Sequence, residues 1–154
     1  MEFGDLLKRF AAAAVTGDGE ALADLFTPDG TYDDYFFGPS TGREAIKKML
    51  AHFADGGRDF RWEFFAPARS GNTGYASYRF SFASKRPEAR GARVTLDGIA
   101  RFDLEGGRIR HYSEVFDRGM ALAQQEVEPE RLRKIGLKYA AALKARPEWA
   151  GHVS

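Results

Sequence analysis

The chain has 154 residues, enough for one domain with a single hydrophobic core, and its 44% hydrophobic and 29% charged residues argue against disorder. Lysine and arginine number 23 against 22 acidic residues, so the net charge of +1 creates no overall field that would attract nucleic acid or an anionic membrane. Cysteine is absent, which excludes disulfides, a thiolate nucleophile and cysteine-bound metals, and the three histidines are too scattered to indicate a metal site.

The spacing of apolar residues predicts three helices and one strand in the first third of the chain. Gly17 ends the first helical run, and the turn-forming sequence Thr-Pro-Asp-Gly at 27–30 ends the second. Gly38 followed by Pro39 breaks the strand, and Thr41 is placed to cap the third helix. The expected elements are a helix over 3–16, a short helix carrying Leu22, Leu25 and Phe26, a strand over 31–37 and a helix over 41–54.

From Asp59 onward the pattern is one of strands joined by short turns, which indicates consecutive antiparallel hairpins. A final amphipathic helix over about 129–145 starts at Pro129, a residue suited to the first helical position. Helices segregated from an antiparallel sheet predict the α+β class. We expect one domain over 1–154, with a core over about 3–118 and a helical extension over about 120–148. The strands are expected near 60–69, 74–84, 92–104 and 108–117.

Four segments carry a resemblance to a known superfamily. They are Gly-Asp-Gly-Glu-Ala-Leu at 17–22, Leu-Phe-Thr-Pro-Asp-Gly-Thr-Tyr-Asp-Asp at 25–34, Gly-Arg-Glu-Ala-Ile at 42–46 and Gly-Arg-Ile-Arg-His-Tyr at 107–112. On these residues the chain resembles the nuclear transport factor 2-like superfamily, which includes ketosteroid isomerases and SnoaL-like polyketide cyclases. The resemblance covers about residues 3–118. It implies a curved antiparallel sheet that three helices close into a cone with a pocket, and it is weak for the reaction because this fold hosts many activities.

The resemblance also suggests a catalytic base. Counted back from Gly42, the carboxylate base of ketosteroid isomerases falls within about one position of Asp34. Strand alternation places Asp34 on one face with Tyr32 and Phe36, and Asp33 on the other face. Partial burial beside these rings would raise the pKa of Asp34 and suit it to general-base work near neutral pH. The alternative is that the two aspartates form a solvated strand end.

The isomerase pattern fails at two other positions. Its oxyanion tyrosine falls at Phe10, which cannot donate a hydrogen bond and is kept here only as a pocket-lining candidate. Its second donor, a neutral aspartic acid, aligns with Gly98, one residue beyond Asp97. Steroid isomerisation by that set of residues is therefore not expected.

Glu114 is a second candidate acid. Tyr112, Glu114 and Phe116 share a face of the last strand, which is similar to the last strand of limonene epoxide hydrolases and polyketide cyclases, where an acidic residue faces the pocket. A carboxylate between two rings is costly unless it is paired or protonated, so its burial would need a reason. The alternative is a salt bridge at the rim with Arg79 or Arg101.

Arg79 is the third candidate. Epoxide hydrolases of this fold carry Arg-x-Asp where this chain has Arg79-Phe80-Ser81, so their triad is incomplete here. Arg79 could still stabilise an anionic oxygen or keep Glu114 ionised. It shares one face of its strand with Tyr75. The alternative is an exposed arginine on the outside of the sheet.

The sequence thus predicts a cofactor-free acid–base enzyme of the isomerase, dehydratase or lyase type that acts on a small hydrophobic, aromatic or polycyclic substrate. An aromatic content of 14% is consistent with a ring-lined pocket. The alternative is a non-catalytic domain that binds a hydrophobic ligand or dimerises. The expected catalytic residues are Asp34, Glu114 and Arg79, and the expected substrate-binding residues are Tyr32, Phe36, Tyr75, Tyr112 and Phe10.

We also expect a homodimer that forms through the outer face of the sheet, because both faces of the strand over 74–84 carry rings. No metal, nucleic acid or membrane partner is expected. The acidic N-terminus carries no targeting pattern, so the expected location is the cytoplasm.

Overall fold

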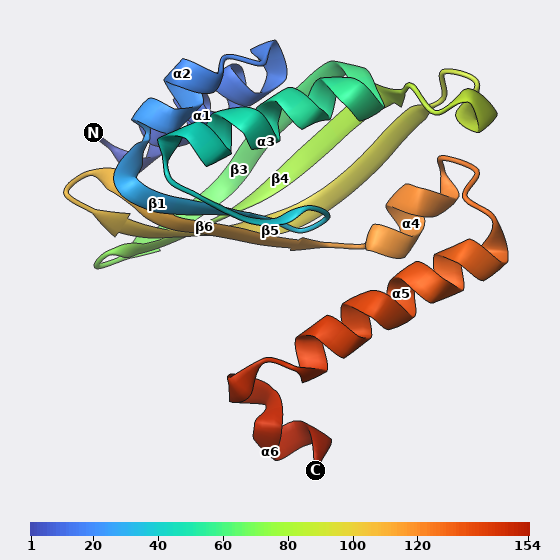
Figure 1. The fold of residues 1–154 in the computed structure, drawn as a ribbon. Coiled ribbons are helices and arrows are strands. Elements are labelled where there is room, and N and C mark those ends of the chain that lie inside the picture. Colours follow the sequence, from blue (N-terminus) through green and yellow to red (C-terminus); the bar gives the residue numbers. More distant parts are fainter.

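A curved six-stranded sheet forms the body of the protein (Figure 1). The computed structural model describes all 154 residues. The strands are β1 (Phe26–Asp34), β2 (Gly38–Thr41), β3 (Gly57–Ser70), β4 (Thr73–Ser84), β5 (Arg93–Glu105) and β6 (Arg108–Phe116). They lie in the order β2-β1-β6-β5-β4-β3, and every neighbouring pair is antiparallel except β1 with β6. The predicted α+β class with a curved sheet is confirmed.

Three helices, α1 (Phe3–Thr16), α2 (Gly19–Asp24) and α3 (Arg43–Gly56), lie together over one face of the sheet (Figure 1). Gly17 ends α1 in the left-handed conformation, with φ of 71°, and the Asp18 side chain caps α2 by accepting from the Ala21 amide. The apolar face of α1 is buried against the sheet, where Phe10 is fully covered and packs on the rings of Tyr32 and Tyr112. This helical layer fixes which sheet face is the inner one.

The first strand differs from the prediction at both ends. Residues 27–30 do not form a separate turn but an irregular stretch of β1, where the pairing with β6 shifts register between Phe26 and Thr31. At the other end, the strand does not run on to residue 37. It turns back through residues 35–37 into β2, with Asp34 opposite Gly38 in the left-handed region at φ of 82°. The cap of α3 is Gly42, because Thr41 uses its hydroxyl on Thr31 instead.

The direction of the β4 side chains decides which rings enter the cone. Tyr78 is buried and, like Phe80, belongs to the inner face, whereas Tyr75 is 44% exposed and Arg79 is solvated on the outer face. The alternative of an exposed arginine on the outside of the sheet is therefore the one that the structure shows, and the pocket role predicted for Arg79 and Tyr75 is wrong. The outer face still exposes large apolar side chains, and the homodimer through this face stays a prediction. These side chains are Phe65, Tyr75, Ile99 and Val115.

The C-terminal segment forms an arm beyond the sheet. A helix that the sequence did not predict, α4 (Arg118–Ala123), follows β6 directly, and Asp117 caps it through the Met120 amide. The predicted last helix is present as α5 (Pro129–Lys144), and a short α6 (Ala150–Val153) ends the chain. Figure 1 shows α5 leading away from the sheet, and none of its residues is buried. None of the helices combines the length and the apolar character needed to cross a membrane.

Candidate active site

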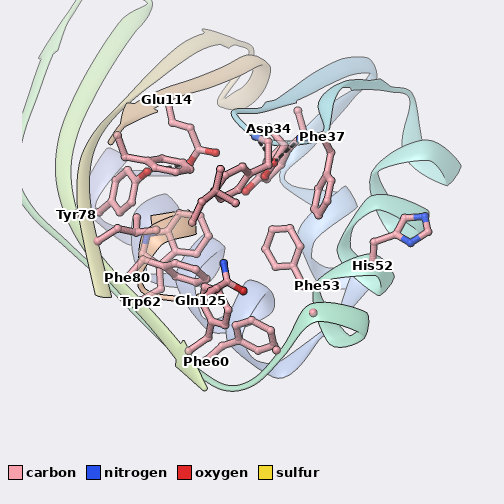
Figure 2. A pocket seen from close by; sticks show the side chains of 18 of the residues that line it. Asp34, Phe37, His52, Phe53, Phe60, Trp62, Tyr78, Phe80, Glu114 and Gln125 are labelled. Atoms are coloured by element: carbon pink, nitrogen blue, oxygen red, sulfur yellow. Dashed lines mark hydrogen bonds between the residues drawn. The ribbon is translucent and has the colours of Figure 1, made fainter. Parts of the chain in front are cut away.

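A cavity of about 360 Å³ lies between the inner sheet face, the end of α3 and the C-terminal arm (Figure 2). Its 19 lining residues include 13 hydrophobic ones, so a bound molecule would meet mainly rings. Only a few polar groups enter this wall, chiefly Asp34 and Glu114. The aromatic lining residues are Tyr32, Phe36, Phe37, Phe53, Phe60, Trp62, Tyr78, Phe80, Phe82, Phe116 and Tyr139.

Two buried carboxyl groups meet at this cavity, Asp34 from the end of β1 and Glu114 from β6 (Figure 2). Their exposed fractions are 6% and 8%. Burial, together with the negative charge of Asp34, raises the pKa of Glu114 to about 8. Burial also raises the pKa of Asp34, although two amide hydrogen bonds act in the opposite direction. The site therefore holds two acids whose surroundings differ.

The hydrogen bonds of Asp34 favour its ionised form. The amides of Phe36 and Phe37 both donate to Oδ2, at 2.9 and 3.0 Å. An aspartate that accepts amides two and three residues further along the chain closes the turn after β1 by itself. Oδ1 has no partner within the protein, so this oxygen is available to a bound molecule.

Glu114 is surrounded by donors. The hydroxyls of Tyr112 and Tyr78 donate to Oε1 at 2.7 and 3.1 Å, and the Tyr35 amide donates to Oε2 at 3.2 Å. These bonds oppose the effect of burial on the pKa of Glu114 but do not cancel it. Three successive amides, those of residues 35–37, thus serve the two carboxyl groups from one turn.

Tyr78 takes a place that a side chain at residue 98 would otherwise fill. A Cβ atom on Gly98 would lie 2.7 Å from the Tyr78 hydroxyl oxygen and 2.5 Å from the Val115 carbonyl oxygen. Gly98 and Tyr78 are direct neighbours across β5 and β4. The absence of a side chain at 98 therefore allows the tyrosine of the adjacent strand to reach Glu114.

Of the eight site residues predicted from the sequence, the structure brings four to the cavity wall: Asp34, Glu114, Tyr32 and Phe36. Tyr112 lies beneath the wall and reaches Glu114 only through its hydroxyl. Phe10 is also beneath it, stacked on Tyr32, and is not a lining residue.

Arg79 and Tyr75 lie outside the cavity, which corrects the prediction that they take part in the site. Arg79 donates to Glu63 on the outer face at 3.0 Å, and its guanidinium lies 4.1 Å from the centroid of the Phe65 ring. Alternation along β4 puts Phe80, the residue between Arg79 and Ser81, into the cavity instead. Neither Arg79 nor Ser81 can therefore serve an epoxide hydrolase triad here.

Several residues that line the cavity were not among the site residues predicted from the sequence. Tyr78, Phe80 and Phe82 repeat with a period of two, but this pattern alone does not say which face of the sheet they occupy. Trp62 carries no sequence signal that separates a core residue from a lining residue, and its indole contacts Tyr78 and Phe80 at the cavity. The contributions of Gln125 and Tyr139 depend on how the C-terminal arm folds back, which no local pattern reveals.

No curated protein matches the chain, but many solved structures do. A hypothetical protein with a ketosteroid isomerase-like fold from Catenulispora acidiphila, in complex with trimethylamine, has a TM-score of 0.72 and 23% identity over 80% of this chain and 94% of that one. A proposed polyketide cyclase from Xanthomonas campestris has a TM-score of 0.66 and 21% identity over 79% and 95%. An epoxide hydrolase of M. tuberculosis has a TM-score of 0.64 and 15% identity over 79% and 87%.

These likenesses support the fold, which the described strand order and helices already define. The model of one family, the SnoaL-like domain, matches residues 7–112, which is more than half of the chain and includes Asp34 and Tyr112. The chain therefore belongs to the family of SnoaL-like domains.

Proposed function

We propose that the protein is an acid–base enzyme that acts on a small hydrophobic, ring-bearing substrate. One observation carries this proposal: two buried carboxyl groups with raised pKa values face a single aromatic cavity, and their hydrogen bonds differ. A cavity that only bound an apolar molecule would need neither group. The resemblance to a proposed polyketide cyclase and to an epoxide hydrolase supports an enzymatic role.

Asp34 is the base in this proposal. Its Oδ2 is held by two amides, which keeps the side chain oriented, while Oδ1 has no protein partner and can accept a proton. The raised pKa of Asp34 makes it a stronger base than an exposed aspartate. The proton would come from a carbon next to a carbonyl group, and the electron pair would move to the carbonyl oxygen.

Glu114 and Tyr78 are the acid side of the proposal. Because the pKa of Glu114 is about 8, its carboxyl group holds a proton at neutral pH. That proton can stabilise the negative charge that develops on the substrate oxygen, while the hydroxyl of Tyr78, which donates to Glu114 Oε1, holds the acid in place. Return of the proton from Asp34 to another carbon gives an isomerase outcome, and protonation and departure of a hydroxyl group gives a dehydratase or lyase outcome.

The substrate class follows from the cavity wall. A volume of about 360 Å³ is at the small end of the range for drug-sized ligands, and rings on both sides favour a flat aromatic or polycyclic molecule. At least one polar group is expected on that molecule, because the buried Tyr32 hydroxyl at the cavity has no hydrogen-bond partner within the protein.

A thermal-shift panel of aromatic and polycyclic ketones and alcohols tests this class. A compound present at about 100 times its Kd should stabilise the protein by about 2.7 kcal/mol, a rise in Tm of several degrees. Phe80→Ala should abolish the shift because Phe80 lines the cavity. Tyr75→Ala is the matched control, since it removes a ring from the outer sheet face and should keep the shift. Shifts that persist in Phe80→Ala, or a panel without any shift, would contradict the assignment.

A further inference from the structure

A guanidinium group joins the turn after β1 to the C-terminal arm. Arg118, the first residue of α4, lies 3.3 Å from the centroid of the Tyr35 ring and 3.7 Å from the centroid of the Tyr139 ring. Its Nε also donates to the Tyr35 carbonyl oxygen at 2.7 Å. One half-buried side chain therefore contacts the turn through a ring and a carbonyl, and contacts α5 through a second ring.

The turn held in this way is the one that carries the amides of the active site. Residues 35–37 donate to Glu114 once and to Asp34 twice. The turn lies at the edge of the sheet, where only the four-residue β2 follows it, and Phe37 at its tip is 59% exposed. Phe36 of the turn packs against the hydrophobic core and Tyr35 packs on Phe116, and the Arg118 side chain adds a contact to Tyr35 from the C-terminal arm.

We propose that Arg118 is a positioning residue of the acid–base site: by holding Tyr35 against Tyr139, it keeps the turn amides on Asp34 and Glu114 and couples the C-terminal arm to the two carboxyl groups. This inference rests on the proposed function for its catalytic meaning. Arg118 is not a cavity-lining residue, so it acts through the turn and not on the substrate.

Electrostatics gives the proposal a signature that simple destabilisation lacks. Burial is the main reason for the raised pKa of Asp34, and the amides of Phe37 and Phe36 oppose it; the charge of Asp33 raises this pKa further, and the positive charge of Arg118 lowers it by a smaller amount than the amides do. Removing Arg118 takes away the positive charge and loosens the amides, so both effects move the Asp34 titration to higher pH. The other titratable groups that surround Asp34 are Glu114 of β6, Tyr32 of β1, Tyr78 of β4, His52 of α3 and Tyr139 of α5.

The test is a titration of the Asp34 carboxyl carbon by NMR, together with the pH profile of kcat. Arg118→Met should move the titration of Asp34 and the acid limb of the profile to higher pH, and lower kcat about tenfold with little change in KM. Arg118→Lys keeps the charge but loses the planar stack, so its shift should be smaller. Arg133→Met, an equal change of charge at an exposed residue of α5, is the matched control and should leave the Asp34 titration and the pH profile of kcat unchanged.

Tyr139 provides an independent arm of the test. Tyr139→Leu should move the Asp34 titration in the same direction because the guanidinium loses one ring, whereas Tyr139→Phe keeps the ring and should keep the titration. The proposal is overturned if Arg118→Met folds and its Asp34 titrates as in the wild type. If Arg118→Met does not fold, the same result in both folded Arg118→Lys and folded Tyr139→Leu overturns it. The NMR titration needs no turnover. A failure of the proposed function, seen as unchanged turnover in Asp34→Asn, is thus distinguishable from a failure of this coupling.

Discussion

Replacing Asp34 by asparagine is expected to lower kcat about 10²-fold or more, because the amide keeps the size of the side chain but cannot accept a proton. The asparagine can still accept the Phe36 and Phe37 amides through its carbonyl oxygen, so the turn should stay in place. Substrate affinity should change much less than kcat. Steady-state kinetics, with affinity measured separately by thermal shift, would check both statements.

Asp33 offers a matched control beside the base. Its Oδ2 lies 4.0 Å from His111 Nε2, and Asp33 belongs to the other face of β1. Asp33→Asn should therefore leave turnover nearly intact. If Asp33→Asn proved the crippling variant, the base would lie on the outer side of the strand, and if neither variant mattered, the acid–base proposal would be wrong.

Glu114→Gln is expected to lower activity, because the amide cannot give up a proton, and yet to stabilise the protein at alkaline pH. The pKa of Glu114 is about 8 in the folded state against an ordinary value of 4.5, so between these pH values the folded protein holds a proton that the unfolded chain has lost. Stability consequently falls as pH rises through this window. Glutamine mimics the protonated acid and does not titrate, which avoids this loss.

The expected gain is about 1–3 kcal/mol in the free energy of unfolding at pH 8, and close to zero at pH 5. Loss of the Tyr35 amide bond to Oε2 offsets part of it. Urea unfolding at both pH values would measure the difference, and the rate of the wild type should fall as pH rises past about 8, where Glu114 loses its proton. Glu63→Gln, on the exposed outer face, is the control and should show no such dependence. The account would be contradicted if the difference in the free energy of unfolding between Glu114→Gln and the wild type did not grow from pH 5 to pH 8.

The sequence predicted the strands from β3 onward to within about three residues, because hairpins with glycine-containing turns and alternating patterns define themselves locally. Asp34 and Glu114 were also found, because the family resemblance pointed to these two positions and strand alternation places rings two residues away from each. Arg79 shows the limit of this reasoning. The pleat separates the faces of β4 with certainty, but which face is the inner one depends on the packing of α1 against the sheet.

The C-terminal arm shows a second limit. The apolar spacing was sufficient to find α5, and Pro129 marked its first residue. The place of Tyr139 at the cavity, however, depends on α4 and on the contact with Arg118, which lies 21 residues earlier in the chain. Long-range contacts of this kind leave no periodic signal in a single sequence.

The position of the two tryptophans gives the protein a built-in optical reporter. Trp62 lines the cavity, with its ring centroid 5.0 Å from that of Phe80, while Trp149 stands 36% exposed near the C-terminus. Indole emission responds to the polarity and the rings around it, so filling of the cavity is expected to alter the fluorescence of Trp62, whereas Trp149 is not a lining residue. With Trp149 replaced by phenylalanine, the remaining emission comes from the cavity alone, and association and release of unlabelled compounds can be followed in real time by stopped flow.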